Sequence, residues 1–118
     1  MTHATRFVAA VAVLTALALC VPVQAQTPAA DALRVRAEAG VAEAQNNLGV
    51  SYGTGAGVPQ DYVQAHMWAN LAASRRTGED RETSVSLRDR IADELTPDDL
   101  SEAQRFAREW DAAHPREP

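Results

Sequence analysis

Apolar residues recur at steps of three and four along residues 26–113, and no stretch of strand length alternates between apolar and polar with period two. This spacing predicts helices and no β-sheet, so the expected fold class is all-α. We expect about five helices, over residues 29–39, 41–52, 59 or 61 to 76, 80–95 and 97–112. The stripes predict the inward-facing residues Ala30, Leu33, Ala37, Val41, Ala44, Leu48, Tyr52, Tyr62, Ala65, Trp68, Ala69, Ala72, Leu87, Ile91, Leu95, Leu100, Ala103, Phe106, Ala107 and Trp110.

Local signals mark several helix ends. Thr96 is a predicted N-cap, with Pro97 as the first helical residue and Leu95 placed to pack on Leu100. Gly40 and Gly78 are expected to stop the helices that precede them. Residues 114–118 contain two prolines and are expected to form a loose tail.

Residues 1–25 have the layout of a secretory signal peptide. Arg6 precedes fifteen uncharged residues, and Pro22 is followed by Val23-Gln24-Ala25, which ends in a small residue. The apolar run is shorter than the roughly 20 residues that a bilayer-spanning helix needs. We therefore expect cleavage after Ala25, no membrane span in the mature form, and a secreted or periplasmic protein.

Cys20 allows a competing interpretation. The segment Leu17-Ala18-Leu19-Cys20 is similar to the lipobox of bacterial lipoproteins, in which the cysteine is acylated. That motif has a small residue before the cysteine, whereas this chain has Leu19. We therefore favour a cysteine that is removed with the signal peptide.

Composition narrows the classes of partner. The chain has no lysine, and residues 26–118 carry ten arginines and sixteen acidic residues, a net charge of −6. This balance argues against nucleic acid as a partner. The 93 residues suffice for one small domain, expected over residues 26–113.

Two predicted helices joined by the glycine-rich segment 53–60 form a helical hairpin, with its repeat core at residues 39–74. Close approach of the two helices is expected at Gly49, and Trp68 is expected between them. The hairpin resembles the Sel1-like repeat, a relative of the tetratricopeptide repeat. The pattern is met at Gly40, Ala42, Ala44, Gln45, Leu48, Gly49, Tyr52, Gly55, Gly57, Val58, Asp61, Ala65, Trp68, Ala72 and Ala73.

The resemblance implies a short α–α superhelix that binds other proteins. Only one full repeat is present, preceded by what looks like the second helix of a lost repeat and followed by a helix pair at 80–112. The open face around Leu33 and Ala37 could then support a homo-oligomer. The first helix of such a hairpin lines the concave surface, which predicts a partner-binding face at Glu43, Asn46, Asn47, Val50 and Ser51.

The candidate chemistry is sparse. Segment 53–57 has the glycines of a phosphate loop but no following lysine, and His66 has no second metal ligand at helical spacing. His66 is expected to be half exposed or a partner contact, and the helical serines, Ser84 among them, to be solvated. We expect no catalytic set, metal or cofactor.

These observations favour a non-catalytic protein-interaction module, an adaptor or scaffold, with an unidentified protein partner. A small inhibitor or regulatory subunit that its partner completes is the first alternative. A hydrolase acting on the cell wall is the second, suggested only by the expected compartment and by scattered acidic residues.

Overall fold

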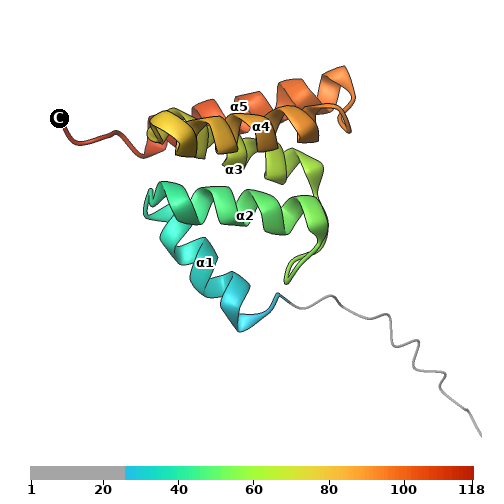
Figure 1. Cartoon of the computed structure of the whole chain (residues 1–118), viewed down its shortest axis with the longest axis horizontal. Helices are drawn as coiled ribbons and strands as arrows, with labels where there is room; N and C mark the ends of the chain where they lie inside the picture. Colours follow the sequence, from blue (N-terminus) through green and yellow to red (C-terminus); the bar gives the residue numbers. More distant parts are fainter. Residues whose placement is uncertain (1–25) are drawn as a thin grey trace, which may run out of the picture.

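The computed structural model describes residues 26–118, and the regular structure in that part of the chain is entirely helical. The helices are α1 (Pro28–Glu38), α2 (Ala42–Thr54), α3 (Tyr62–Arg75), α4 (Gly78–Ala92) and α5 (Pro97–Ala113) (Figure 1). The all-α class and the five helices are confirmed. The predicted signal peptide, its cleavage after Ala25 and the alternative role of Cys20 lie outside the described residues.

The helices stack as successive antiparallel pairs. Helices α2 and α3 form the hairpin of the predicted repeat, α1 packs on α2, and both α4 and α5 pack on α3 (Figure 1). Helices α2 and α4 therefore run in the same direction, side by side along one face. This is the short α–α superhelix that the sequence predicts.

Side-chain caps explain where three of the helices begin. Oxygens of Thr27, Asp61 and Thr96 accept hydrogen bonds from backbone N–H groups three residues later, at 3.2, 3.1 and 3.1 Å. Each bond satisfies a donor that has no partner within the helix. The Thr96 cap is confirmed.

The role predicted for Gly78 is wrong. Helix α3 ends at Arg75, and Gly78 is the first residue of α4 rather than the stop of the preceding helix. Its φ of +60° falls in the region that glycine adopts without steric penalty, which permits the sharp turn from α3 into α4.

Helices α2 and α3 approach each other closely at Gly49. A Cβ atom there would lie 3.2 Å from both the Ala65 carbonyl oxygen and the Ala69 backbone nitrogen. The missing side chain therefore lets α2 reach the backbone of α3, as predicted. Leu48 of α2 and Leu71 of α3 are core residues with almost no exposed surface.

Trp68 is buried, as predicted, and it also contacts the last helix. Its ring centroid lies 5.8 Å from that of Trp110 on α5, in an edge-to-face arrangement. Trp68 thus ties the repeat to α5 instead of packing only between α2 and α3. The prediction that Val41 faces inward is wrong, because this residue precedes α2 as its N-cap position and is exposed.

Candidate functional site

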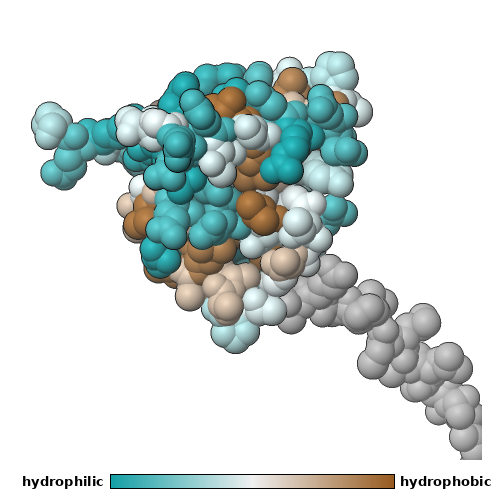
Figure 2. All heavy atoms as spheres, viewed as in Figure 1, coloured by the Kyte–Doolittle hydropathy of each residue, from teal (hydrophilic) through white to brown (hydrophobic). Residues whose placement is uncertain are grey.

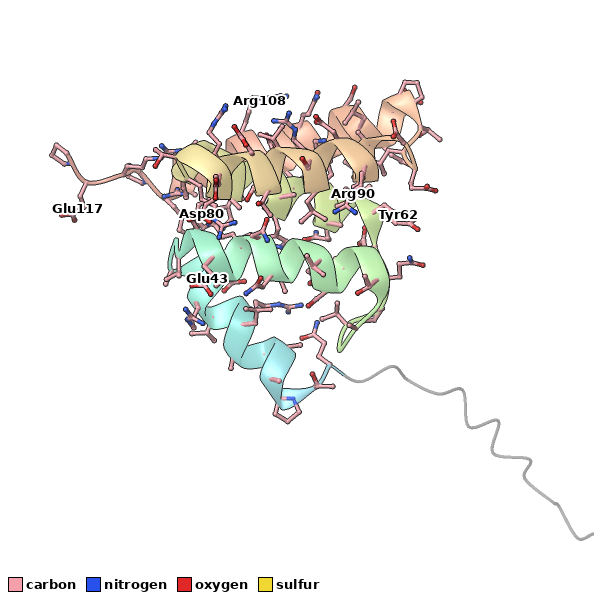
Figure 3. The ribbon with its side chains drawn as sticks, in the orientation of Figure 1. Glu43, Tyr62, Asp80, Arg90, Arg108 and Glu117 are labelled. Atoms are coloured by element: carbon pink, nitrogen blue, oxygen red, sulfur yellow. The ribbon has the colours of Figure 1, made fainter. Side chains whose placement is uncertain are left out.

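Two separate hollows lie along the face where α2 and α4 lie side by side, and we call the two together the α2/α4 groove. The hollow at its polar end has a volume of about 590 Å³, and the hollow at its apolar end has a volume of about 290 Å³. Figure 3 shows Glu43 and Asp80 at the polar end and Tyr62 and Arg90 at the apolar end. The polar end is lined by Ala42, Glu43, Asn47, Arg75, Arg76, Thr77 and Asp80. The apolar end is lined by Val50, Gly53, Thr54, Tyr62, Leu87, Arg90, Ile91 and Glu94.

Two arginines at the polar end are held in place by other parts of the molecule. Arg75 Nη2 donates to Asp111 Oδ1 at 3.0 Å, and its guanidinium lies over the Trp110 ring, 5.0 Å from the centroid. Arg76 Nη1 donates to Ser84 Oγ at 3.0 Å. These contacts fix positive charge next to the acidic side chains of Glu43 and Asp80, so this end carries both signs of charge.

The apolar end has an accessible hydrophobic floor. Val50 is 41% exposed, while Leu87 and Ile91 of α4 are largely covered and form the wall behind it. Gly53 contributes no side chain, and a Cβ there would lie 3.9 Å from Ile91 Cδ1. Figure 2 shows hydrophobic residues between α2 and α4 with hydrophilic residues around them. Such a patch with a charged rim suits an apolar side chain of a protein partner.

The structure divides the predicted partner-binding face. Glu43 and Asn47 line the polar end of the α2/α4 groove, whereas Val50 lines the apolar end. Ser51 lies on a different side of α2, in a shallow cleft of about 280 Å³ beside α1. The exposed residues of the predicted face are therefore distributed over three separate hollows.

The prediction that Asn46 belongs to the partner-binding face is wrong, because Asn46 is not a surface residue. Its side chain is 8% exposed, and its Oδ1 accepts a hydrogen bond of 2.8 Å from Ser84 Oγ on α4. Ser84 itself has no exposed surface, so the prediction that it is solvated is also wrong. A buried polar side chain is stable when it is hydrogen-bonded, and these two bond each other across α2 and α4.

The prediction that His66 is half exposed is also wrong. It is 3% exposed, not half exposed, because α4 and α5 cover the face of α3 on which it lies. Burial, and next the positive charge of Arg88, lower its pKa from the ordinary 6.5, while Asp89 acts weakly in the opposite direction. The imidazole is therefore neutral at pH 7.

Several residues of the α2/α4 groove were not among the predicted site residues. Leu87, Arg90 and Ile91 enter it only because α4 lies beside α2, and Tyr62 is contributed by the first turn of α3. The available signal was the helix pair expected at 80–112 after the repeat, which did not specify the helix beside which α4 would lie.

Residues of the repeat pattern connect α2 with α1 and with α3. Gln45 Nε2 donates to the Ala37 carbonyl of α1 at 3.1 Å, and within the hairpin the Asp61 backbone N–H donates to the Tyr52 carbonyl at 2.9 Å. Gly55 and Gly57 have φ values of +77° and +78° in the turn. Leu48, Ala65 and Ala72 are completely buried.

Residues 26–118 bring together no group of three or more histidine, cysteine, aspartate or glutamate side chains able to hold a metal ion. None of the helices in that range has the length and apolar character to cross a bilayer.

Residues 42–76 match the family model of the Sel1 repeat. The match covers α2, the glycine-rich turn and α3, so this hairpin is similar to a Sel1 repeat. No curated protein and no solved structure matches the chain. A Sel1 repeat indicates a protein–protein interaction module.

Proposed function

We propose that this chain, which contains one Sel1 repeat, is a non-catalytic adaptor or scaffold whose protein partner docks in the α2/α4 groove. The observation that carries the proposal is the accessible Val50 floor at one end of the groove and side chains of both charge signs at the other. A partner segment would place an apolar side chain on Val50. It would place polar groups near Asn47, Glu43 and Asp80.

The test compares two exposed valines, Val50 and Val35. Val50 lies in the α2/α4 groove, whereas Val35 is 68% exposed on α1, outside it. The tagged full chain, Val50→Asp and Val35→Asp are each cross-linked in the cells that make the protein, and the captured proteins are identified by mass spectrometry. We expect Val50→Asp to lose the partner and Val35→Asp to keep it, with both variants folded by circular dichroism.

The α1 side of the molecule favours one alternative function. The cleft between α1 and the turn is lined mainly by small and apolar groups, among them Ala30, Leu33 and Gly57, and Val35 stands exposed on the same helix. A partner that completes the solenoid, as for an inhibitor or a regulatory subunit, would cover this side. Loss of capture by Val35→Asp alone would support this alternative over the groove. If a second copy of the chain covers this side instead, wild type should have the molecular mass of an oligomer in solution and Val35→Asp should have a lower one.

We further propose that the protein acts outside the cytoplasm, after cleavage following Ala25. The support is the three-part layout of residues 1–25. The mass of the exported protein should correspond to a chain that begins at Gln26. A mass that includes an acylated Cys20 would overturn this assignment.

A further inference from the structure

A second hollow lies between α3, α4 and α5, away from the α2/α4 groove, and we call it the His66 cavity. Its volume is about 260 Å³. Pairs of residues one helical turn apart line it from each helix, and Asp89 completes the lining. The residues are His66 and Asn70 on α3, Arg88, Asp89 and Ala92 on α4, and Leu100 and Gln104 on α5.

The polar groups of the His66 cavity have unused hydrogen-bonding capacity. His66 is 97% buried, and its Nδ1 has no partner within residues 26–118. The side-chain amides of the half-buried Asn70 and the exposed Gln104 form no hydrogen bond with any residue of that range, so they can bind either water or a ligand. A buried polar atom without a partner is unfavourable, so an unpaired imidazole nitrogen at a cavity points to a ligand or to ordered water.

Arg88 supplies the positive charge among the residues that line the His66 cavity. Its Nε and Nη2 both donate to Asp89 Oδ1, at 3.0 and 2.9 Å, and its Nη1 is left without a protein acceptor among the described residues. The Arg88 side chain is 29% exposed, whereas that of Asp89 is 62% exposed. The carboxylate of this pair therefore faces water more than the guanidinium does.

We propose that the His66 cavity binds a small carboxylate. Arg88 Nη1, Asn70 Nδ2, Gln104 Nε2 and the N–H of the neutral His66 imidazole are four donors, and an ionised carboxylate offers about four lone-pair sites and no donor. Ala92 and Leu100 provide apolar surface for the short hydrocarbon part of the ligand. The ligand could be a free small acid or the carboxyl terminus of another protein chain, since the chemistry is the same.

The first experiment titrates the full-length protein with sodium acetate and follows the His66 imidazole by NMR. Acetamide, which has a similar shape and no charge, is the matched control ligand. We expect a saturable shift of the His66 resonances with acetate and at least a tenfold weaker response to acetamide. Equal responses to the two ligands, or no saturable shift with acetate, would overturn the proposal.

The second experiment compares Arg88→Gln with Arg90→Gln on the same helix. Arg90 lines the α2/α4 groove and not the His66 cavity. Arg88→Gln should weaken acetate binding at least tenfold, and Arg90→Gln should leave it unchanged, with both variants melting near the wild-type temperature. Equal weakening by the two variants would mean that only overall charge matters, which would overturn the site.

The third readout is the titration of His66 with and without saturating acetate. The charged groups that line the cavity beside it are Arg88 and Asp89 of α4, while α5 contributes only Leu100 and Gln104. A bound anion favours the imidazolium, so His66 should titrate at higher pH in the complex. An unchanged His66 titration with acetate bound would place the anion elsewhere and refute the site.

The same titration with acetyl-trialanine and with its C-terminal amide separates the two ligand sources. Tighter binding of the peptide acid than of acetate would support a protein carboxyl terminus as the ligand. Weaker binding of the peptide acid would support a free small acid. The amide should bind in neither case, and binding of the amide as tightly as the acid would contradict carboxylate recognition.

Discussion

Asn46 and Asn47 are neighbours in the sequence and should respond to substitution in opposite ways. Asn46 Oδ1 accepts the Ser84 hydroxyl at 2.8 Å in a buried contact between α2 and α4. Asn47 faces the α2/α4 groove and is exposed. Replacement of each by alanine therefore tests the buried contact between α2 and α4.

The expected loss of stability depends on which hydrogen-bonding group each substitution leaves without a partner. Asn46→Ala leaves the buried Ser84 hydroxyl proton without its acceptor, although Ser84 Oγ still accepts a hydrogen bond from Arg76 Nη1 at 3.0 Å. Loss of one partner of a buried hydrogen bond costs about 1 to 3 kcal/mol of the free energy of unfolding. That is a large part of the roughly 5 to 10 kcal/mol expected for a domain of this size. Asn47→Ala should change the free energy of unfolding by at most about 0.5 kcal/mol.

The assay is urea unfolding followed by tryptophan fluorescence, with thermal melting by circular dichroism as a second measurement. Since 1 kcal/mol shifts the melting temperature of so small a domain by about 4 to 8 °C, Asn46→Ala should melt roughly 5 to 20 °C below wild type. In a double-mutant cycle with Ser84→Ala, the pair should be coupled by at least about 0.5 kcal/mol, because removing both partners leaves no unsatisfied hydroxyl between them. Equal effects of Asn46→Ala and Asn47→Ala, or no coupling to Ser84, would refute the contact.

Three further predictions concern the packing of the hairpin and the buried histidine. Gly49→Ala should destabilise the protein by about 1 to 3 kcal/mol, since its Cβ would press on the backbone of α3, even though alanine favours helix by about 1 kcal/mol. Gly53→Ala on the same helix, where the nearest atom would be 3.8 Å away, should be neutral or stabilising, and a loss as large as that of Gly49→Ala would contradict the close contact. Trp68→Ala should cost about 3 to 5 kcal/mol, and a melting temperature within a few degrees of wild type would show that this ring is not in the core. The pKa of His66 is lowered in the folded state, so as the pH falls below 6.5 the unfolded chain takes up a proton at this residue before the folded chain does, and the protein should become less stable. His66→Gln should therefore lose less stability than wild type between pH 7.5 and 5.5. An identical loss in the two proteins would contradict the lowered pKa of His66.

Much of the fold was predictable because its signals are local. The 3–4 apolar spacing predicted helices, and Thr96-Pro97 marked the start of α5 within the chain itself. Gly49 stood out because a glycine inside a helix needs a compensating close contact, and the structure supplies one with α3. Each of these inferences used residues within a few turns of one another.

The candidate site could not be predicted as well as the fold, because it is formed by contacts between residues far apart in the sequence. Asn46 and Ser84 are 38 positions apart, and nothing near either residue distinguishes a buried amide from a solvated one. His66 looked like a partly exposed histidine until α4 and α5 covered it. Trp68 was correctly expected in the core, but its contact with Trp110 required the position of α5.

The sequence by itself determined the helices, the Thr96 cap of α5 and the repeat hairpin, because backbone propensity, capping and apolar periodicity act over short distances. Only the tertiary structure decided which polar faces of those helices remain open. Whether a polar side chain meets water depends on the helix that packs over it, and α4 and α5 pack by combined contacts with α3 that no single segment encodes. For that reason Asn47 and Val50 line the α2/α4 groove, while Asn46 is buried as part of the wall between α2 and α4.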